Sequence, residues 1–131
     1  MYDYDEGRKE AALLDKEKRI KAEKTRLTKI FKDVDQKKQK VVYGLIERAA
    51  FMRVQLEDLE ADINLNGFTE WFAQGVNQEP YQRKRPNADQ YNVMSASYAK
   101  VVKQLTDLLP KDVSGSIDDG FDGFVNGRGE I

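Results

Sequence analysis

Cysteine and histidine are both absent from this 131-residue chain. Without cysteine the chain can form neither disulfides nor thiolate–metal sites. Without histidine it lacks the commonest zinc ligand and the usual general base of enzymes. Long apolar runs are missing too, since no stretch approaches the roughly 18 residues of a membrane span and the first residues lack a signal-peptide core. We therefore expect a soluble, cytosolic protein with no cofactor and no metal.

Sequence motifs for catalysis are also missing. The chain has neither a Gly-rich phosphate loop of the Walker kind nor a glycine fingerprint after a strand. Glu57, Asp58, Glu60 and Asp62 are close in sequence, but successive positions on a helix point in different directions, so the four cannot converge on one ion. A solvated helix face explains them better than a metal site. We expect no catalytic residue, and hence a protein that is not an enzyme.

The net charge of −1 conceals an uneven distribution along the chain. Residues 8–40 hold thirteen basic and six acidic residues, a net charge of +7. Residues 110–131 have a net charge of −3. A basic end and an acidic end indicate different partners for the two termini.

Two apolar stripes, each with spacings that alternate between three and four residues, dominate the middle of the chain. The first consists of Val42, Leu45, Ala49, Met52, Leu56, Leu59 and Ile63. The second consists of Ala88, Tyr91, Ser95, Tyr98, Val102, Leu105 and Leu109. Such spacing keeps one face of a helix directed at a partner. The stripes predict an all-α fold in which two long antiparallel helices form a hairpin core, preceded by a basic helix.

Local signals divide the chain into three regions. We expect a basic, helical N-terminal region over residues 1–34 with a disordered start at residues 1–7, a helical-hairpin core over 35–110 and a flexible, acidic, Gly-rich tail over 111–131. Within the core, Asp35 and Asn87 are the expected N-caps of the two long helices. Asn66-Gly67 should end the first of these helices, and Pro110 should end the second.

Between the two long helices, we predict a loop over residues 67–86. Its aromatic residues, Phe68, Trp71 and Phe72, are expected to close the end of the hairpin. Arg83, Lys84 and Arg85 beside Tyr81 could instead grip a nucleic-acid strand, but a solvated loop is the favoured interpretation.

A second apolar face on the first long helix predicts self-association, because a helix that is apolar on two faces is usually covered from two sides. The hairpin partner would cover one face and a neighbouring copy the other. The expected interface residues are Tyr43, Ala50, Phe51, Val54 and Ala61.

The basic region predicts contacts with the phosphate backbone of nucleic acid. Acidic neighbours such as Glu17 and Glu23 could instead pair with these cations along an exposed helix. The candidate DNA-binding residues are Lys16, Lys18, Arg19, Lys21, Lys24, Arg26, Lys29, Lys32, Lys37, Lys38 and Lys40. In the tail, Phe121 and Phe124 stand in an acidic frame and could form a short motif that orders on a partner, although composition alone fits disorder without function nearly as well.

Several ordered segments together resemble a known family. LIERAAFM at 45–52 and LEDL at 56–59 look like the core signature of small terminase subunits from tailed bacteriophages. YNVM at 91–94 and KQLTDLLP at 103–110 are similar to the second helix of that family, and DGFDGFVNGR at 119–128 to its ending. The resemblance covers roughly residues 25–128. One departure is that the helix-turn-helix found in many small terminases is not evident here, which leaves the position of the DNA site open.

The resemblance implies a non-catalytic packaging factor in the cytoplasm of the bacterial host. Such subunits form homo-oligomeric rings, bind double-stranded viral DNA and deliver it to the large terminase subunit, which carries the ATPase and nuclease. We expect Phe121 and Phe124 to dock on that large subunit. Two alternatives remain, an oligomeric helical scaffold or regulator that does not bind DNA and a small dimeric DNA-binding regulator.

Overall fold

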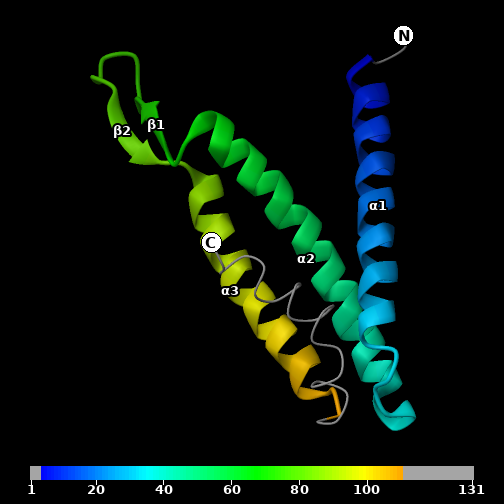
Figure 1. Ribbon diagram of the computed structural model, residues 1–131. Coiled ribbons are helices and arrows are strands. Elements are labelled where there is room, and N and C mark those ends of the chain that lie inside the picture. Colours follow the sequence, from blue (N-terminus) through cyan, green and yellow to red (C-terminus); the bar gives the residue numbers. More distant parts are fainter. Residues whose placement is uncertain (1–3, 111–131) are drawn as a thin grey trace.

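The computed structural model describes residues 4–110 and is mostly helical, with 75% helix and a small two-stranded sheet. Three helices account for most of this part of the chain: α1 at Tyr4–Ile30, α2 at Gln39–Asn66 and α3 at Pro86–Asp107. A 3-10 turn at Gln36–Lys38 precedes α2, and the strands β1 at Thr69–Phe72 and β2 at Tyr81–Lys84 lie between α2 and α3. Figure 1 shows α2 and α3 side by side, with α1 packed against the other side of α2.

The structure confirms that the two apolar stripes face each other in a hairpin of α2 and α3. In α2, Val42, Ala49, Met52, Leu56 and Ile63 are buried. In α3, Ala88, Tyr98, Leu105 and the following Leu109 are buried as well. The remaining members of both stripes are half-buried. Because burying an apolar side chain contributes about 1.5–3 kcal/mol, these two rows are the main source of hairpin stability.

Some of the helix ends predicted from the sequence are confirmed, and one is wrong. Asp35 accepts a hydrogen bond from the backbone N–H of Lys37 at 3.3 Å and so caps the 3-10 turn that leads into α2. Gly67 follows the last residue of α2 with a φ of 79°, a conformation that glycine adopts at little cost. The predicted cap at Asn87 is wrong, because α3 begins at Pro86 and has no side-chain cap. Proline suits this first position because the first N–H of a helix has no partner within it.

α1 joins the core through its C-terminal half. Leu27 is fully buried, and Phe31 and Val34, which follow the helix, are 1% and 4% exposed. They pack in one cluster with α2 and α3 residues that include Val42 and Leu105. At the other end, α1 rises away from α2 (Figure 1). The expectation of a disordered start is wrong for residues 4–7, which form the first turn of α1.

The segment between α2 and α3 is a β-hairpin and not the predicted loop. β1 and β2 are antiparallel, with Trp71 opposite Gln82 and Phe72 opposite Tyr81. The expected packing of aromatic residues against the end of the helices is wrong as well, because Phe68 and Trp71 are 56% and 70% exposed. Their burial would need the hairpin to fold back onto the helices, whereas it extends beyond them (Figure 1).

Candidate nucleic-acid interface

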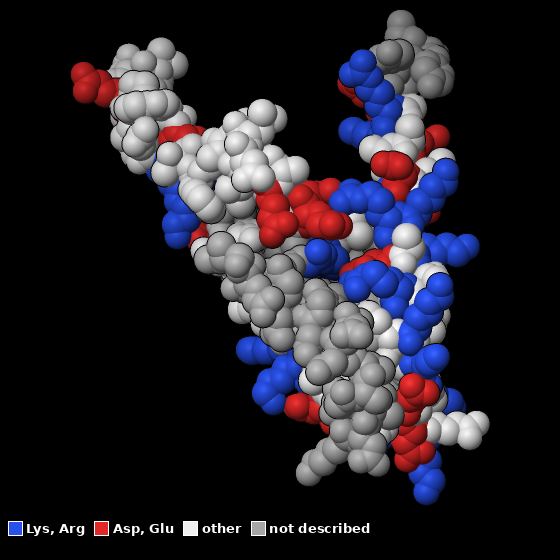
Figure 2. All heavy atoms as spheres, in the orientation of Figure 1, with Lys and Arg blue, Asp and Glu red and all other residues white. Residues whose placement is uncertain are grey.

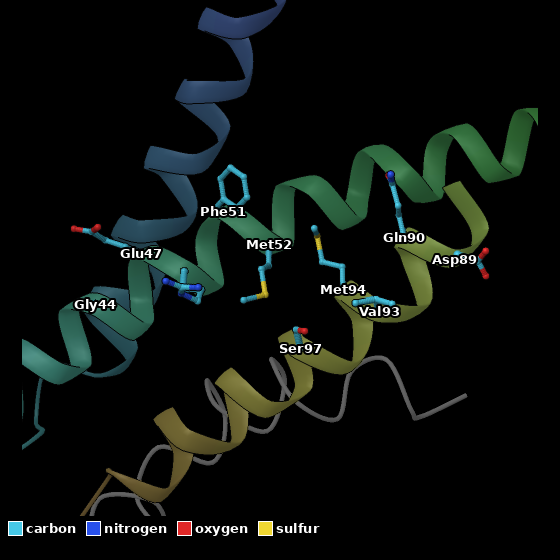
Figure 3. A pocket seen from close by; sticks show the side chains of 10 residues that line it. Gly44, Glu47, Phe51, Met52, Asp89, Gln90, Val93, Met94 and Ser97 are labelled. Carbon is cyan, nitrogen blue, oxygen red and sulfur yellow. The ribbon is translucent and has the colours of Figure 1, made fainter. Parts of the chain in front are cut away.

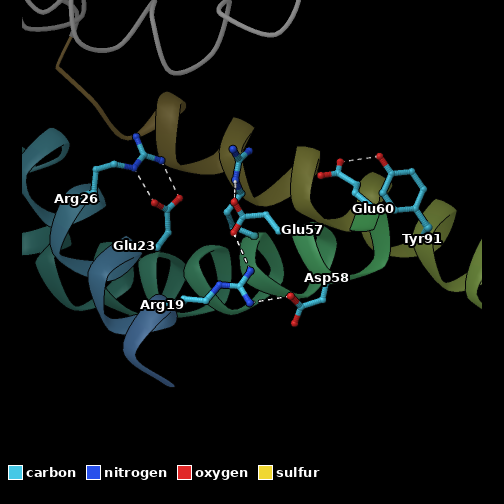
Figure 4. A network of polar contacts seen from close by, with 8 residues as sticks. Arg19, Glu23, Arg26, Glu57, Asp58, Glu60 and Tyr91 are labelled. Carbon is cyan, nitrogen blue, oxygen red and sulfur yellow. Dashed lines mark hydrogen bonds and ion pairs between the residues drawn. The ribbon is translucent and has the colours of Figure 1, made fainter. Parts of the chain in front are cut away.

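Two of the eleven candidate cations tie α1 to α2. Arg19 lies 2.7 Å from Asp58 and 3.4 Å from Glu57 (Figure 4). Lys16 lies 3.0 Å from Asp58. Lys16 also donates to the side chain of Gln55 at 2.7 Å. These contacts join residues nearly forty positions apart in the chain, so they position α1 on α2.

The ionisation of these groups reflects their pairing. The hydrogen bond to Asp58 raises the pKa of the Arg19 guanidinium. Partial burial of Asp58 opposes its ionisation, but hydrogen bonds from Arg19 and Lys16 outweigh it and hold the pKa of Asp58 below its usual 3.8. Both partners are therefore charged at neutral pH, and much of the cationic charge at Lys16 and Arg19 is balanced within the chain.

Two further candidates also have partners within the chain. Arg26 donates twice to Glu23, at 2.6 and 2.7 Å (Figure 4). The ammonium group of Lys24 lies 5.7 Å from the centre of the Tyr43 ring, within the range of a cation–π contact. The predicted pairing of acidic and basic residues within the N-terminal region is thus confirmed for Glu23 and Arg26.

The other seven candidates are exposed and form no ion pair within residues 4–110. They are Lys18, Lys21, Lys29, Lys32, Lys37, Lys38 and Lys40. Lys18 and Lys29 are about three helical turns apart on the side of α1 opposite the buried Leu27, and Lys21 flanks them. Figure 2 shows basic side chains gathered along the outer side of α1. We call Lys18, Lys21 and Lys29 the lysine face.

Residues 83–85 form the alternative nucleic-acid site. Their positive charges are balanced by acidic side chains nearby. Arg83 pairs with Glu70 at 2.7 Å and stacks on Phe72, with 3.4 Å from its guanidinium carbon to the ring centre. Lys84 pairs with Asp89 at 2.8 Å. The Arg83–Glu70 pair joins the two strands of the β-hairpin, and the Lys84–Asp89 pair joins the β-hairpin to α3.

Arg85 fastens the base of the β-hairpin to α2. It lies 2.8 Å from a carboxylate oxygen of Asp62 and donates to the carbonyl of Gly67 at 2.7 Å. Asn87 also donates to Asp62, at 2.8 Å. Hydrogen bonds from Arg85 and Asn87 hold the pKa of Asp62 well below its usual 3.8.

The acidic group on α2 is thus occupied by intrachain contacts. Glu60 accepts a hydrogen bond from the hydroxyl of Tyr91 at 2.9 Å, which raises the pKa of that tyrosine (Figure 4). Across residues 4–110, no three ligand-type side chains are grouped as a metal ion would require. In the same part of the chain, no helix combines the length and apolar character that a membrane span demands.

Comparison with protein-family models, curated proteins and solved structures finds no match for this chain. The candidate surfaces are therefore defined by geometry and charge alone. The predicted docking residues Phe121 and Phe124 lie outside the described residues.

The predicted self-association face is only partly free. Ala50 and Val54 are 0% and 1% exposed, because α1 packs on this side of α2. The prediction that a neighbouring copy covers them is wrong for these two residues. Tyr43 and Phe51 are 55% and 49% exposed, and Ala61 is exposed.

Sequence reasoning missed a groove between α2 and α3. It has a volume of about 820 Å³, and its lining includes Glu47, Arg48, Phe51, Met52, Val93 and Met94. Met52 and Met94 extend from the two helices toward the space between them (Figure 3). Val93 is 68% exposed. We call these six residues the α2–α3 groove. The position of Val93 beside the second apolar stripe was the one available signal.

Proposed function

We propose that this chain is a non-catalytic viral DNA-packaging subunit of the small-terminase type. It self-associates into a ring, binds double-stranded viral DNA, and recruits and regulates a large subunit that carries the ATPase and nuclease. It works in the cytoplasm of a bacterial host. The observation that carries the proposal is the lysine face, together with the family resemblance of the helical core.

The lysine face suits DNA because its charge is uncompensated. Lys18 and Lys29 are separated by about 16 Å along the axis of α1, a distance that reaches several phosphates of one duplex. α1 carries no groove-reading motif, so the contacts would be with phosphates and would favour DNA shape over base sequence. The paired cations Lys16 and Arg19 would contribute little, because their charge is already balanced by Asp58 and Glu57.

The test is the salt dependence of duplex DNA binding by the full chain. Lys18, Lys21 and Lys29 are replaced together by Gln, and each lost phosphate contact should flatten the slope of log K against log salt by about 0.9. The expected change in slope is thus about 2–3 for the triple variant.

A matched control removes the same charge elsewhere. Arg48, Lys100 and Lys103 replaced by Gln give the same net charge, and they lie on α2 and α3. The control should keep the wild-type slope. Equal flattening in both variants would show that only net charge matters, and an unchanged slope in the first would move the DNA site away from α1.

The second candidate function is an oligomeric helical scaffold that does not bind DNA. This function is favoured because four of the eleven candidate cations already have partners within the chain. They are Lys16, Arg19, Lys24 and Arg26. A wild-type chain that forms a large oligomer but shows no salt-sensitive DNA binding would support it.

A further inference from the structure

A cluster of two cations and two carboxylates joins α1 to α2 beside the lysine face. Lys16 and Arg19 share one side of α1, because residues three apart on a helix are neighbours. On α2, Asp58 lies 3.0 Å from Lys16 and 2.7 Å from Arg19, so one carboxylate contacts both cations. Glu57 adds a contact to Arg19 at 3.4 Å. Figure 4 shows Arg19 extending from α1 toward the two carboxylates of α2.

The four side chains of this cluster are open to solvent in part. The exposed fractions are 28% for Lys16, 38% for Arg19, 44% for Glu57 and 40% for Asp58. A flexible cationic side chain at the surface can exchange one anion for another without movement of its helix. Carboxylates and phosphates both suit a guanidinium group, which can bind either through two parallel hydrogen bonds. The carboxylates therefore occupy cations that a phosphate could bind.

The position of the cluster brings it close to the proposed DNA surface. Lys18 of the lysine face immediately precedes Arg19 in α1. A DNA duplex carries one phosphate per about 1.7 Å of its axis when both strands are counted. A duplex on the lysine face would therefore place phosphates near Arg19 as well, in competition with Asp58 and Glu57.

We propose that Glu57 and Asp58 form an autoinhibitory contact, which competes with DNA phosphates for Lys16 and Arg19. The inference rests on the proposed DNA binding by α1 and adds its regulation. Because pairing and DNA binding use the same cations, each weakens the other, so DNA should also loosen this contact between α1 and α2. For a subunit that delivers DNA to a partner, a moderated affinity favours release.

The first test removes the competing charges from the full chain. The neutralised variant, Glu57→Gln with Asp58→Asn, keeps the size of both side chains and leaves Lys16 and Arg19 available to phosphates. Two additional phosphate contacts should steepen the slope of log K against log salt for duplex DNA by about 1–2. At about 0.1 M salt the affinity should rise about tenfold.

A matched control removes two negative charges far from α1. Glu79 lies between β1 and β2, and Asp107 lies at the end of α3. Glu79→Gln with Asp107→Asn gives the same net charge as the neutralised variant, and it also releases Lys103, which pairs with Asp107 at 2.9 Å. The control should keep the wild-type slope. Equal steepening in the two variants would mean that net charge alone sets the affinity, which overturns the proposal.

A double-mutant cycle identifies the cations that are released. Lys16→Gln with Arg19→Gln should flatten the slope by about 1–2 in the neutralised variant, where both cations bind phosphates. The same substitutions should have a clearly smaller effect in the wild type, where the carboxylates already occupy these cations. Arg53 lies 3.9 Å from Glu57 and is also released, but it is present on both sides of each comparison and cannot cause the difference.

A purely structural role of the cluster predicts another outcome. The neutralised variant would then lose thermal stability without any change in slope. Circular dichroism checks that it is folded, as we expect because the burial of Leu27 and Phe31 does not depend on these charges. Asp58→Asn alone removes the carboxylate that contacts both cations and should give a smaller steepening, so the test does not depend on the double substitution. An unchanged slope in these folded variants, or equal effects on both sides of the cycle, overturns the autoinhibitory contact.

Failure of the proposed function is distinguishable from failure of this inference. If neither the wild type nor the neutralised variant shows salt-sensitive DNA binding, both are overturned. If the wild type binds through the lysine face and neutralisation changes nothing, only the autoinhibitory contact is overturned. Binding by the neutralised variant alone would support the contact, because the carboxylates would then control DNA binding completely.

Discussion

The two ends of the three-helix arrangement are held by different forces. At one end α1, α2 and α3 meet around apolar side chains, with Leu27 and Phe31 completely or almost completely buried. Toward the other end Ile63 and Ala88 are still buried, but polar contacts are added, as between Arg19 and Asp58 or Arg85 and Asp62. Apolar burial supplies stability without regard to direction. Ion pairs near the surface contribute little stability but require particular partners. The apolar end thus holds the helices together, and the polar end sets how they are placed.

The largest effect should come from the apolar end. Phe31→Ala removes a ring that is 1% exposed and leaves a cavity, which should lower the free energy of unfolding by about 3–5 kcal/mol. Urea denaturation measures this loss. Phe51→Ala is the matched control because its ring is 49% exposed, and the control should cost clearly less. Equal losses in the two variants would mean that the apolar end is not the stabilising one.

An intermediate effect is expected at the start of the β-hairpin. Gly67 has a φ of 79° and a ψ of −174°, a region that is almost reserved for glycine. Gly67→Ala should lower the free energy of unfolding by about 1–3 kcal/mol through backbone strain alone, since an added Cβ would meet nothing within 4 Å.

Gly75→Ala is the control for this substitution. Its added Cβ would also meet nothing within 4 Å, and its φ is not positive. Thermal unfolding should show a lower midpoint for the first variant and little change for the second. A Gly67→Ala protein as stable as the wild type would show that α2 and β1 can be joined in another conformation.

The smallest effect should be a change in pH dependence at the polar end. The pKa of Asp62 is lower in the folded chain than in the unfolded chain, so its ionised form stabilises the fold above about pH 4. That contribution is lost as the pH falls below this value. Asp62→Asn cannot titrate, so its stability should fall less than that of the wild type between about pH 5 and pH 2. Parallel declines in urea unfolding would assign the acid sensitivity to other carboxylates.

Much of the helical core could be predicted from the sequence, because helix periodicity is a local property. The regular spacing from Val42 to Ile63 identified the buried face of α2, and Gly67 identified its end. The β-hairpin was missed because its strands are only four residues long and lie largely exposed, so no apolar alternation marks them. The burial of Ala50 could not be assigned to α1, since sequence alone does not say which helix covers which face.

The candidate site was predictable in composition but not in geometry. The basic character of α1 was evident, but its division into paired and unpaired cations depends on contacts between distant residues, such as Arg19 with Asp58. The α2–α3 groove arises from the way two helices are placed side by side, and residues such as Phe51 and Val93 lie about forty positions apart. Periodicity along one helix contains no information of that kind.

The shape of α1 also has a mechanical consequence. The helix is about 40 Å long and is anchored near one end, so a tilt of about 10° at the anchor moves its far end by about 7 Å. Leu27 and Phe31 are buried at the packed end, and Arg19 ties the middle of the helix to Asp58 on α2. A helix held in this way would act as a lever, because a small tilt at its packed end would produce a larger displacement at its exposed N-terminal end.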